Sequence, residues 1–582
     1  MKKIINFFKT NLGFLVLITI IVLLLYGKSI NYQLLDLDDT KSINQNIEFI
    51  SNYKNLPKIF FKDCYFDNIH SYYRPVLLLS FAITAVFFQE NPKPYHFTNL
   101  VLFIFTFYLM YLLLLKLNFN EEILKLIFIL FLIHPIFTSN AVYISPRAEM
   151  LLLIFSLLSI MNLIDFLKEN KRLNLLMTVI FFLFAVFAKE TGIMLIPIYM
   201  AVIYCFNFKI SKKQLIYLCC LLIFPVIIYF YLRSISVPKI EDVIKLENFY
   251  FYIENMVSGL IIYLYKIFIP DNIAVILGKT DIKISYIIFD VLLCLFLFYL
   301  FYKEILNRKI VVFGIVWFVV MLFPTFFVSD YQFFPHRILT AFLGITVILV
   351  SVVDFVVKKY PVSKKYLFVL FLTIFCVYFF ASYKQADKYK NSEIFWGNAY
   401  LDAPEMPTVL ASIGKICIKY GDIENGYKYL KKAVIKNEYY LHIYANDLAI
   451  VLFKKGNLKA AERMLWYGFA TFSTYDDIST IYTEQGNFEK ALMYAKAAYE
   501  IKPYKYNFLK LARLYAMNNN FELAKEMLLK VEDKDDDNYY VLAMLYDDLN
   551  DKENAIKCIR KAIELKPDDN EKYLNLLHKL QE

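Results

Sequence analysis

A succession of apolar runs, each close to the length that crosses a membrane, occupies the first two thirds of this 582-residue chain. A spanning helix needs about 20 apolar residues, and about 17 to 25 are tolerated. With 59% hydrophobic residues and a mean hydropathy of +0.48, the chain is too apolar for a soluble protein of this size. The candidate spans are 12–27, 98–115, 122–136, 149–166, 173–188, 191–207, 214–232, 285–302, 310–328, 338–357 and 366–382. We therefore predict an all-α fold that begins with a polytopic membrane domain of about eleven spans.

Two further apolar stretches are not counted as spans. The stretch 75–88 has only about 14 residues, a length typical of an interfacial or re-entrant segment, and the stretch 250–269 contains Glu254 and Lys266. With both excluded and the N-terminus in the cytoplasm, the positive-inside rule is obeyed by four basic loops, 168–172, 209–213, 303–309 and 358–365. The C-terminal domain is then extracytoplasmic. The Lys-, Ile- and Asn-rich, Gly-poor composition is typical of a prokaryotic plasma membrane protein.

Charge and cysteine content exclude two other classes. The net charge of +10 does not indicate a nucleic-acid partner, because many of the Lys and Arg residues lie in the short loops between apolar runs. Most of the eight cysteines fall within apolar runs, and none has CxxC spacing. This pattern indicates neither a disulfide framework nor a zinc site.

A repeat follows the last apolar run, so we predict a membrane domain at 1–383 and a repeat domain at 384–582. Five turn markers recur at steps of 35, 30, 33 and 31 residues, and a small residue stands five places after each: Gly426, Ala461, Ala491, Ala524 and Ala555. This period is close to the 34 residues of tetratricopeptide repeats. About five such repeats would form an α-solenoid with a concave face. That face would bind an acceptor or partner peptide, or would serve only as a scaffold.

The doublet Asp38-Asp39 lies in the predicted first outer loop, 28–97, and is followed by Ile43 and Asn46. Membrane anchoring does not require paired carboxylates at this place. One carboxylate could take the proton of an acceptor hydroxyl while the other orients the acceptor or the first carboxylate. The alternative is helix N-capping, which needs only one of the two.

Other polar residues interrupt the apolar sequence at the same predicted outer face, which implies one outward-facing site. The cations could stabilise the charge of a leaving phosphate; they are Arg74, Arg147, Lys189 and Arg337. The supporting residues are Asn46, His96, Asn99, His134, Glu149, Glu190 and His336. Structural alternatives remain open: interfacial snorkelling by Arg74, packing or capping by the pair His96 and Asn99, and a self-neutralising Lys189-Glu190 pair.

The ordered set of these motifs resembles a known family. Its members are the transmembrane and tetratricopeptide repeat-containing O-mannosyltransferases, relatives of the protein O-mannosyltransferases of the GT-C fold. The matching residues are Asp38-Asp39 with Ile43 and Asn46, Tyr73-Arg74-Pro75, Tyr95-His96 with Asn99, His134-Pro135, Arg147-Ala148-Glu149, Lys189-Glu190 and His336-Arg337, followed by the repeats. The resemblance covers essentially the whole chain, in the same order.

The resemblance implies an inverting glycosyltransferase that moves a sugar, typically mannose, from a polyprenyl phosphate to a Ser or Thr hydroxyl of an envelope or secreted protein. In this fold an acidic residue of the first outer loop is the base, which carries over to Asp38 or Asp39. His336-Arg337 stands where the family more often has Glu-Arg, and Pro146-Arg147 replaces a usual Gly-Arg. These departures leave the sugar open, so the donor could be another undecaprenyl-phosphate hexose.

Two other functions are compatible with the same sequence features. The chain could be a non-catalytic membrane scaffold that recruits partners through its repeats, or a glycosyltransferase with a glycan or lipid acceptor. A transporter is disfavoured, because it would distribute polar residues through the membrane midplane. The donor lipid is the cosubstrate that the resemblance implies; no metal ligand set is assigned, and a divalent metal requirement stays open.

Overall fold

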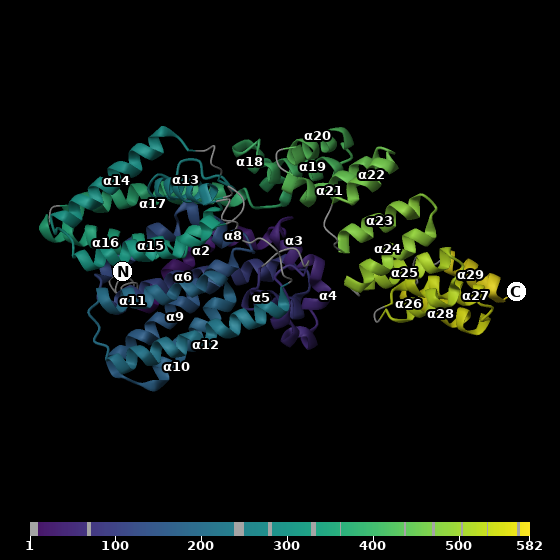
Figure 1. Ribbon diagram of the computed structural model, residues 1–582, viewed down its shortest axis with the longest axis horizontal. Helices are drawn as coiled ribbons and strands as arrows, with labels where there is room; N and C mark the ends of the chain where they lie inside the picture. The colour runs from purple at the N-terminus through teal and green to yellow at the C-terminus, as the bar shows by residue number, and fades with distance from the viewer. Residues whose placement is uncertain are drawn as a thin grey trace. The chain divides into compact units, whose positions relative to one another are not determined.

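The computed structural model describes residues 10–66, 72–237, 249–277, 282–327, 333–360, 363–435, 438–467, 472–501, 505–531, 534–566 and 571–581. The chain divides into two compact units, Met1–Met406 and Pro407–Glu582. Helices form both units (Figure 1), and the β-structure of the described residues is one isolated bridge between Leu277 and Phe333. The predicted all-α fold is therefore confirmed.

The first unit is a bundle of long apolar helices joined by short helical turns. Its α-helices are α2 (Asn11–Tyr26), α3 (Asp38–Ser42), α4 (Ile47–Ile50), α5 (Pro75–Phe88), α6 (Pro92–Lys116), α7 (Glu121–Leu132), α8 (Thr138–Val142), α9 (Arg147–Glu169), α10 (Arg172–Ala188), α11 (Leu195–Cys205), α12 (Lys212–Ser236), α13 (Phe249–Phe268), α14 (Ile284–Tyr302), α15 (Arg308–Leu322), α16 (Phe342–Lys359), α17 (Ser363–Asp387) and α18 (Ser392–Asp402). Short 3₁₀ turns include η1 (Gly27–Asn31), η3 (Tyr53–Phe61), η4 (Pro135–Phe137), η5 (Glu190–Met194) and η9 (Pro335–Ile338).

Each of the eleven predicted spans falls on helical segments, but fewer meet the length and apolarity of a full crossing. Among the described residues, seven helices do so, or eight if α7 and the segment Pro135–Val142, bent by 58°, form one span. Three shorter apolar helices, Pro75–Phe88, Arg172–Ala188 and Glu190–Cys205, accompany them. The span predicted at 338–357 corresponds to α16, which carries three charged residues near its C-terminus. Composition therefore supports a polytopic membrane unit with fewer full-length crossings than eleven.

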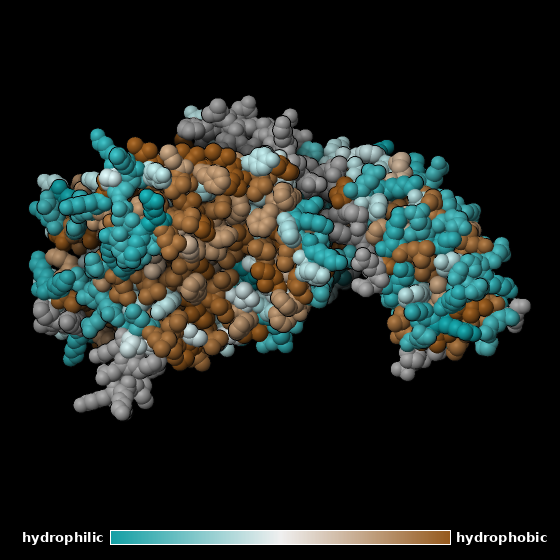
Figure 2. All heavy atoms as spheres, turned by 90° about the horizontal axis from the view of Figure 1, so that it is seen from below, coloured by the Kyte–Doolittle hydropathy of each residue, from teal (hydrophilic) through white to brown (hydrophobic). Residues whose placement is uncertain are grey.

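The surface of this unit agrees with membrane insertion. Figure 2 shows hydrophobic residues over the middle of the helical body and hydrophilic residues toward its two ends. At one place two helices approach closely: a Cβ added at Gly344 of α16 would collide with the Gly314 carbonyl oxygen of α15. Small residues at helix contacts are typical of packing within membranes, because backbones can then approach each other.

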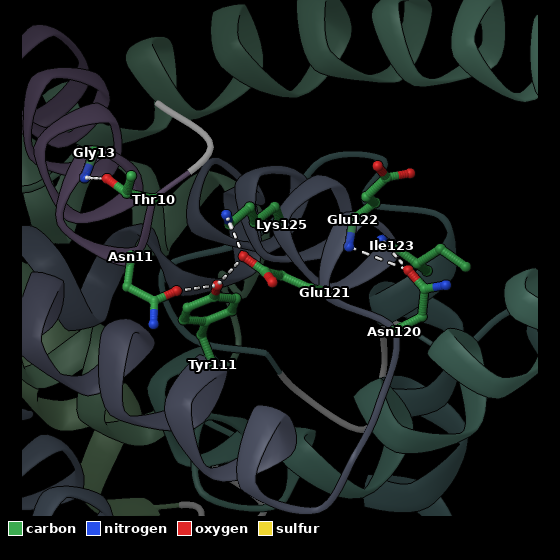
Figure 3. A network of polar contacts seen from close by, with 9 residues as sticks. All are labelled: Thr10, Asn11, Gly13, Tyr111, Asn120, Glu121, Glu122, Ile123 and Lys125. Carbon is green, nitrogen blue, oxygen red and sulfur yellow. Dashed lines mark hydrogen bonds and ion pairs between the residues drawn. The ribbon is translucent and has the colours of Figure 1, made fainter. Parts of the chain in front are cut away.

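A polar network joins the start of α2, the end of α6 and the start of α7 (Figure 3). The buried Tyr111 hydroxyl donates to Asn11 Oδ1 at 2.8 Å. Lys125 pairs with Glu121 at 2.6 Å, one helical turn away. Asn120 caps α7 by accepting from the Glu122 amide at 3.1 Å. The two contacts at the start of α7 join sequence neighbours, whereas Tyr111 links the end of α6 to the start of α2 across 100 residues.

The first unit extends beyond the predicted boundary at residue 383, because α18 packs within it. The Trp396 and Phe395 side chains are buried, at 2% and 1% exposure. The Phe395 ring lies 5.6 Å from that of Tyr389 and 6.3 Å from that of Tyr143, measured between ring centroids. The boundary between the two units accordingly lies at Met406, after α18.

The second unit is a series of antiparallel helix pairs. Its helices are α19 (Pro407–Lys419), α20 (Ile423–Ile435), α21 (Glu438–Lys454), α22 (Leu458–Leu465), α23 (Phe472–Glu484), α24 (Phe488–Ile501), α25 (Lys505–Met517), α26 (Phe521–Leu529), α27 (Asp536–Asp548), α28 (Lys552–Leu565) and α29 (Glu571–Gln581). The turns between paired helices contain left-handed residues, with φ of 86° at Gly421 and 78° at Gly456. The five small residues predicted from the repeat are buried. Turn and packing positions thus recur as the sequence predicts.

Candidate active site

The acidic doublet belongs to a tight turn, residues 35–40, which we call the acidic turn. The Leu35 carbonyl accepts hydrogen bonds from the amides of Leu37 at 2.8 Å and Thr40 at 3.3 Å. The Leu35 amide donates to Asp39 Oδ2 at 3.1 Å. The N-cap position of α3 is occupied by Leu37, and both aspartates lie in its first turn. The N-capping alternative therefore does not describe either carboxylate.

Asp39 is fully buried and fastens the acidic turn to the segment before α9. The Ser145 hydroxyl donates to Asp39 Oδ1 at 2.5 Å. Burial raises the pKa of the Asp39 carboxyl to about 7, although the hydrogen bonds from Ser145 and Leu35 favour its charged form. Both carboxylate oxygens of Asp39 thus have partners within the protein, an arrangement that suits positioning.

Asp38 differs from its neighbour in exposure and in partners. The residue is half-buried, and within the described parts of the chain no hydrogen bond to its carboxylate is found. Its negative charge adds to the effect of burial in raising the pKa of the Tyr65 hydroxyl and of the Cys64 thiol. The Asp38 carboxylate therefore lies close enough to Cys64 and Tyr65 for its charge to act on both groups.

The Tyr72 hydroxyl marks the point at which charges from four segments meet. The guanidinium carbon of Arg74 lies 4.5 Å from the centre of the Tyr72 ring. Burial raises the pKa of this hydroxyl, and the positive charges of Arg74 and Arg337 oppose the rise. The negative charges of Glu190 and Asp38 add to it. Because such effects need short separations, residues far apart in the sequence are brought together here.

Cations also converge on His336, in η9. Burial lowers the pKa of its imidazole well below the ordinary value, and three positive charges lower it further, those of Arg337, Lys189 and Arg74. The imidazole stacks on Phe334 with 5.3 Å between ring centroids. Three of the four cations predicted from the sequence therefore act on one imidazole.

Two of these cations are paired with carboxylates. Arg74 makes a two-pronged contact with Glu190, Nε to Oε2 at 2.9 Å and Nη2 to Oε1 at 2.6 Å. Lys189 pairs with Oε1 of Glu149, and the side chains of this pair are only 12% and 4% exposed. Arg337 belongs to the same cluster, since its positive charge acts on both His336 and Tyr72. The pairs hold the cations in fixed orientations, as a preorganised phosphate site requires.

Arg147, at the start of α9, is fully buried and uses all three of its nitrogens within the protein. Its Nε donates to Asn99 Oδ1 at 2.7 Å, and Nη2 donates to the Tyr95 carbonyl at 2.9 Å. Its Nη1 donates to the Ser80 carbonyl at 3.2 Å, and the guanidinium lies 4.8 Å from the centre of the Phe81 ring. Arg147 therefore braces α5, α6 and α9 against one another.

Two amide residues of the predicted set also brace backbone. Asn46 is buried and its Nδ2 donates to the Lys41 carbonyl at 2.6 Å, which fixes the end of the acidic turn's helix. Asn99 donates to the Tyr143 carbonyl at 2.7 Å while accepting from Arg147. Both residues position segments that carry the charged cluster.

The two remaining histidines lie apart from the cation cluster. His134 Nδ1 accepts from the Ile136 amide at 3.1 Å, and its Nε2 lies 2.9 Å from the Ile267 carbonyl oxygen. The His96 ring is buried edge-on against Tyr32, with 6.3 Å between ring centroids. These contacts give His134 and His96 supporting roles in packing.

Sequence reasoning assigned no role to Tyr72 or Ser145, although each belongs to a motif that it used. Tyr72 stands two residues before Arg74, and Ser145 stands two residues before Arg147. Their positions two residues before Arg74 and Arg147 were the only sequence signal that could have indicated a role for them. As for metals, among the described residues no group of three or more His, Cys, Asp or Glu is arranged to hold an ion.

Comparison with known families adds two matches. Residues 73–240 match the family described as Dolichyl-phosphate-mannose-protein mannosyltransferase, and residues 472–505 and 536–569 match the tetratricopeptide repeat. A region similar to the mannosyltransferase family thus precedes C-terminal tetratricopeptide repeats, which confirms the predicted resemblance. The first match includes Arg74, Arg147 and Lys189 but begins after the acidic doublet.

A curated relative is a Protein O-mannosyl-transferase of Caenorhabditis elegans, 28% identical over 169 residues. The match covers 28% of this chain and 24% of that protein, so the chain spans about a quarter of the length of the relative it matches. Solved structures with some likeness include YrrB, a TPR protein with an unusual peptide-binding site, at 17% identity and a TM-score of 0.27, covering 32% of this chain and 98% of YrrB. MamA from Desulfovibrio magneticus RS-1 has 16% identity and a TM-score of 0.25, covering 28% and 97%.

Proposed function

From a chain in which a mannosyltransferase family domain precedes tetratricopeptide repeats, we infer a membrane glycosyltransferase. It transfers a sugar, with mannose as the first candidate, from a polyprenyl-phosphate donor to a Ser or Thr hydroxyl of a protein. The observation that carries the proposal is the half-buried Asp38 carboxylate, whose charge acts on Tyr72 together with those of Arg74 and Arg337, beside the cations Arg74, Lys189 and Arg337 that act on His336. A base and a phosphate site are the two elements that such a transfer requires.

In this reaction Asp38 is the general base. Its carboxylate takes the proton of the acceptor hydroxyl as the oxygen attacks C1 of the sugar from the face opposite the phosphate. The C1–O bond to the phosphate breaks, the sugar inverts at C1, and the polyprenyl phosphate leaves with the bonding electron pair. Asp39, held by Ser145 and the Leu35 amide, orients the acidic turn.

The cation cluster stabilises the leaving phosphate. A guanidinium can donate two parallel hydrogen bonds to phosphate oxygens, which suits Arg74 and Arg337, whereas Lys189 contributes a point charge. Glu190 and Glu149 orient Arg74 and Lys189 through their ion pairs. His336 packs among the cations in its neutral form. Arg147 supports the site through its backbone contacts and does not touch the donor.

Further parts of the proposal concern partners and location. The repeats bind the acceptor protein in their concave face, because stacked helix pairs present an extended surface for peptides. The apolar helices hold the enzyme in a plasma membrane with the N-terminus in the cytoplasm, so the acidic turn and the repeats work on the outer face.

The test is transfer by the full-length protein reconstituted in liposomes. Polyprenyl-phosphate mannose and polyprenyl-phosphate glucose are supplied in parallel with Ser- and Thr-containing peptides, with and without a metal chelator. Mass spectrometry of the peptides should show an added hexose, and peptides with Ala at every Ser and Thr should show none. Partner binding by the repeats without transfer to any peptide, glycan or lipid would instead identify a scaffold.

A further inference from the structure

The segment that follows the last apolar helix contacts the first outer loop at several points. The Lys28 side chain pairs with Asp387 at 2.8 Å and donates to the Tyr383 carbonyl at 2.6 Å. The Tyr32 hydroxyl donates to Asp387 Oδ1 at 2.9 Å. The Gln33 amide donates to the carbonyl of Lys390 at 3.1 Å. Residues 383–396, which we call the junction segment, thus contact residues 28–33, which lead into the acidic turn.

The last two contacts of the junction segment fall on the acidic turn itself. The Asp36 amide donates to the Ser392 hydroxyl oxygen at 2.7 Å. The Trp396 indole N–H donates to the Asp36 carbonyl at 3.3 Å. Ser392 and Trp396 are four residues apart on α18, so they lie on one helix face. Both backbone polar groups of Asp36, two residues before Asp38, are therefore held by a single helix.

The acidic turn is consequently fixed from two directions. On one side Ser145 holds Asp39, and on the other side α18 holds Asp36. Asp38 lies between these anchored residues and has no such contact through its own carboxylate. A displacement of about 1 Å in a catalytic group can cost about 10²-fold in rate. The position of Asp38 thus depends on side chains more than 350 residues away in the sequence.

Packing makes α18 a firm support for this contact. The Asn391 side chain caps α18 by accepting from the Ile394 amide at 2.9 Å. Phe395 and Tyr389 are buried beside Tyr143, whose ring lies 6.3 Å from each of theirs. Because the Trp396 indole is itself only 2% exposed, its N–H has a defined direction toward the acidic turn.

We propose that Ser392 and Trp396 are positioning residues that clasp the backbone of Asp36 and so set the catalytic position of Asp38. This inference rests on the proposed function for its effect on turnover, while the clasp itself is a property of the fold. It assigns a role in the reaction to the segment immediately before the repeats, which neither the mannosyltransferase family match nor the repeat match includes.

The experiment compares Ser392→Ala and Trp396→Phe in the full-length reconstituted protein. The first change removes the hydroxyl that accepts from Asp36, and the second keeps an aromatic ring but removes the N–H donor. Matched controls are Ser234→Ala, whose hydroxyl bonds within its own helix, and Tyr231→Phe, an exposed aromatic residue. Hydrogen–deuterium exchange of the peptide 33–42 is read beside the kinetics of transfer.

Both clasp variants should exchange faster in this peptide, by roughly 2- to 10-fold. The kcat for transfer should fall by about 10- to 100-fold while the KM for donor stays unchanged. Combined with Asp38→Asn, either change should cost little more, because the residue they position has lost its base. The two control variants should match the wild type in both measurements.

Wild-type exchange in both clasp variants would overturn the clasp. An equal further loss in the Asp38→Asn background would overturn positioning, because Ser392 and Trp396 would then act independently of the base. If the wild type transfers no sugar, the proposed function fails by itself, and the exchange of peptide 33–42 still decides whether α18 holds the acidic turn.

Discussion

Tyr95 and Tyr111 stand on the same helix, α6, about 24 Å apart along its axis, and the polar residues around them are organised differently. Near Tyr111 one contact reaches Asn11, 100 residues away, while Lys125 pairs with Glu121 one turn away and the Glu121 side chain is 50% exposed (Figure 3). Near Tyr95, the fully buried Arg147 reaches groups from distant parts of the sequence.

The difference separates contacts that close a helix end from contacts that build a site. Partly exposed pairs one helical turn apart, such as Lys125–Glu121, contribute about 0.3 to 0.5 kcal/mol. Buried pairs such as Lys189–Glu149, whose side chains are 12% and 4% exposed, carry a desolvation cost that their attraction need not repay. Membrane anchoring does not require buried ion pairs, so it does not explain this desolvation cost. The concentration of buried charge at the Asp38 end therefore argues for catalysis there.

The largest effect is expected for Asp38→Asn, which keeps the shape of the side chain but removes the basic oxygen. Because a hydroxyl is a poor nucleophile, transfer should slow by about 10²- to 10⁴-fold, while binding of the donor lipid is retained. Transfer and donor binding are measured on the same reconstituted samples. Near-normal transfer by the double variant Asp38→Asn/Asp39→Asn would show that neither carboxylate is the catalytic base.

A smaller loss is expected when Arg74 or Arg337 is replaced by Lys. Each change keeps the charge but loses the two-pronged geometry that fits phosphate oxygens, so turnover should fall roughly tenfold or more. Arg308→Lys is the matched control, since Arg308 pairs with Glu304 on an exposed surface. Full activity in both site variants would reduce these arginines to membrane anchors.

Asp39 should make folding stability depend on pH. The folded pKa of about 7 lies above the ordinary value of 3.8, so the folded state holds this proton more tightly than the unfolded state does. Its contribution to stability is therefore full below about pH 4 and is lost as pH rises toward 7. Thermal unfolding across this range should show a flatter pH dependence in Asp39→Asn. An unchanged slope would show that Asp39 does not titrate there.

The smallest effect is expected at the other end of α6. Tyr111→Phe removes one hydrogen bond to Asn11 and should cost about 0.5 to 1.5 kcal/mol of stability, measured by thermal unfolding, with transfer unchanged. A loss of transfer comparable to that of the arginine variants would erase the distinction between the two ends.

Much of this organisation follows from sequence because it is periodic or local. Apolar runs locate the helices of the first unit, and the turn and small residues locate the repeats. The doublet Asp38-Asp39 and the cations are visible as polar interruptions of apolar sequence. Their convergence at one site follows once they are assigned to the same ends of spans.

Other features depend on contacts that no local pattern reveals. The sequence predicts that Arg147 binds the phosphate of the donor lipid. In the structure its three nitrogens instead donate to backbone and amide oxygens of α5 and α6. The domain boundary was expected at 383, whereas α18 returns to the acidic turn through Ser392 and Trp396. Such partners lie tens to hundreds of residues apart, so only the folded chain identifies them.

The most direct test of the central claim, that the Asp38 carboxylate is the base, is chemical rescue by formate. Transfer is measured for Asp38→Ala and Asp39→Ala in the reconstituted system with increasing formate. Because Asp38 is half-buried and Asp39 is enclosed, a small carboxylate can enter only the first position. Formate should therefore restore transfer in Asp38→Ala and leave Asp39→Ala unchanged. Wild-type transfer by Asp38→Ala without formate, or rescue of Asp39→Ala in its place, would contradict the claim.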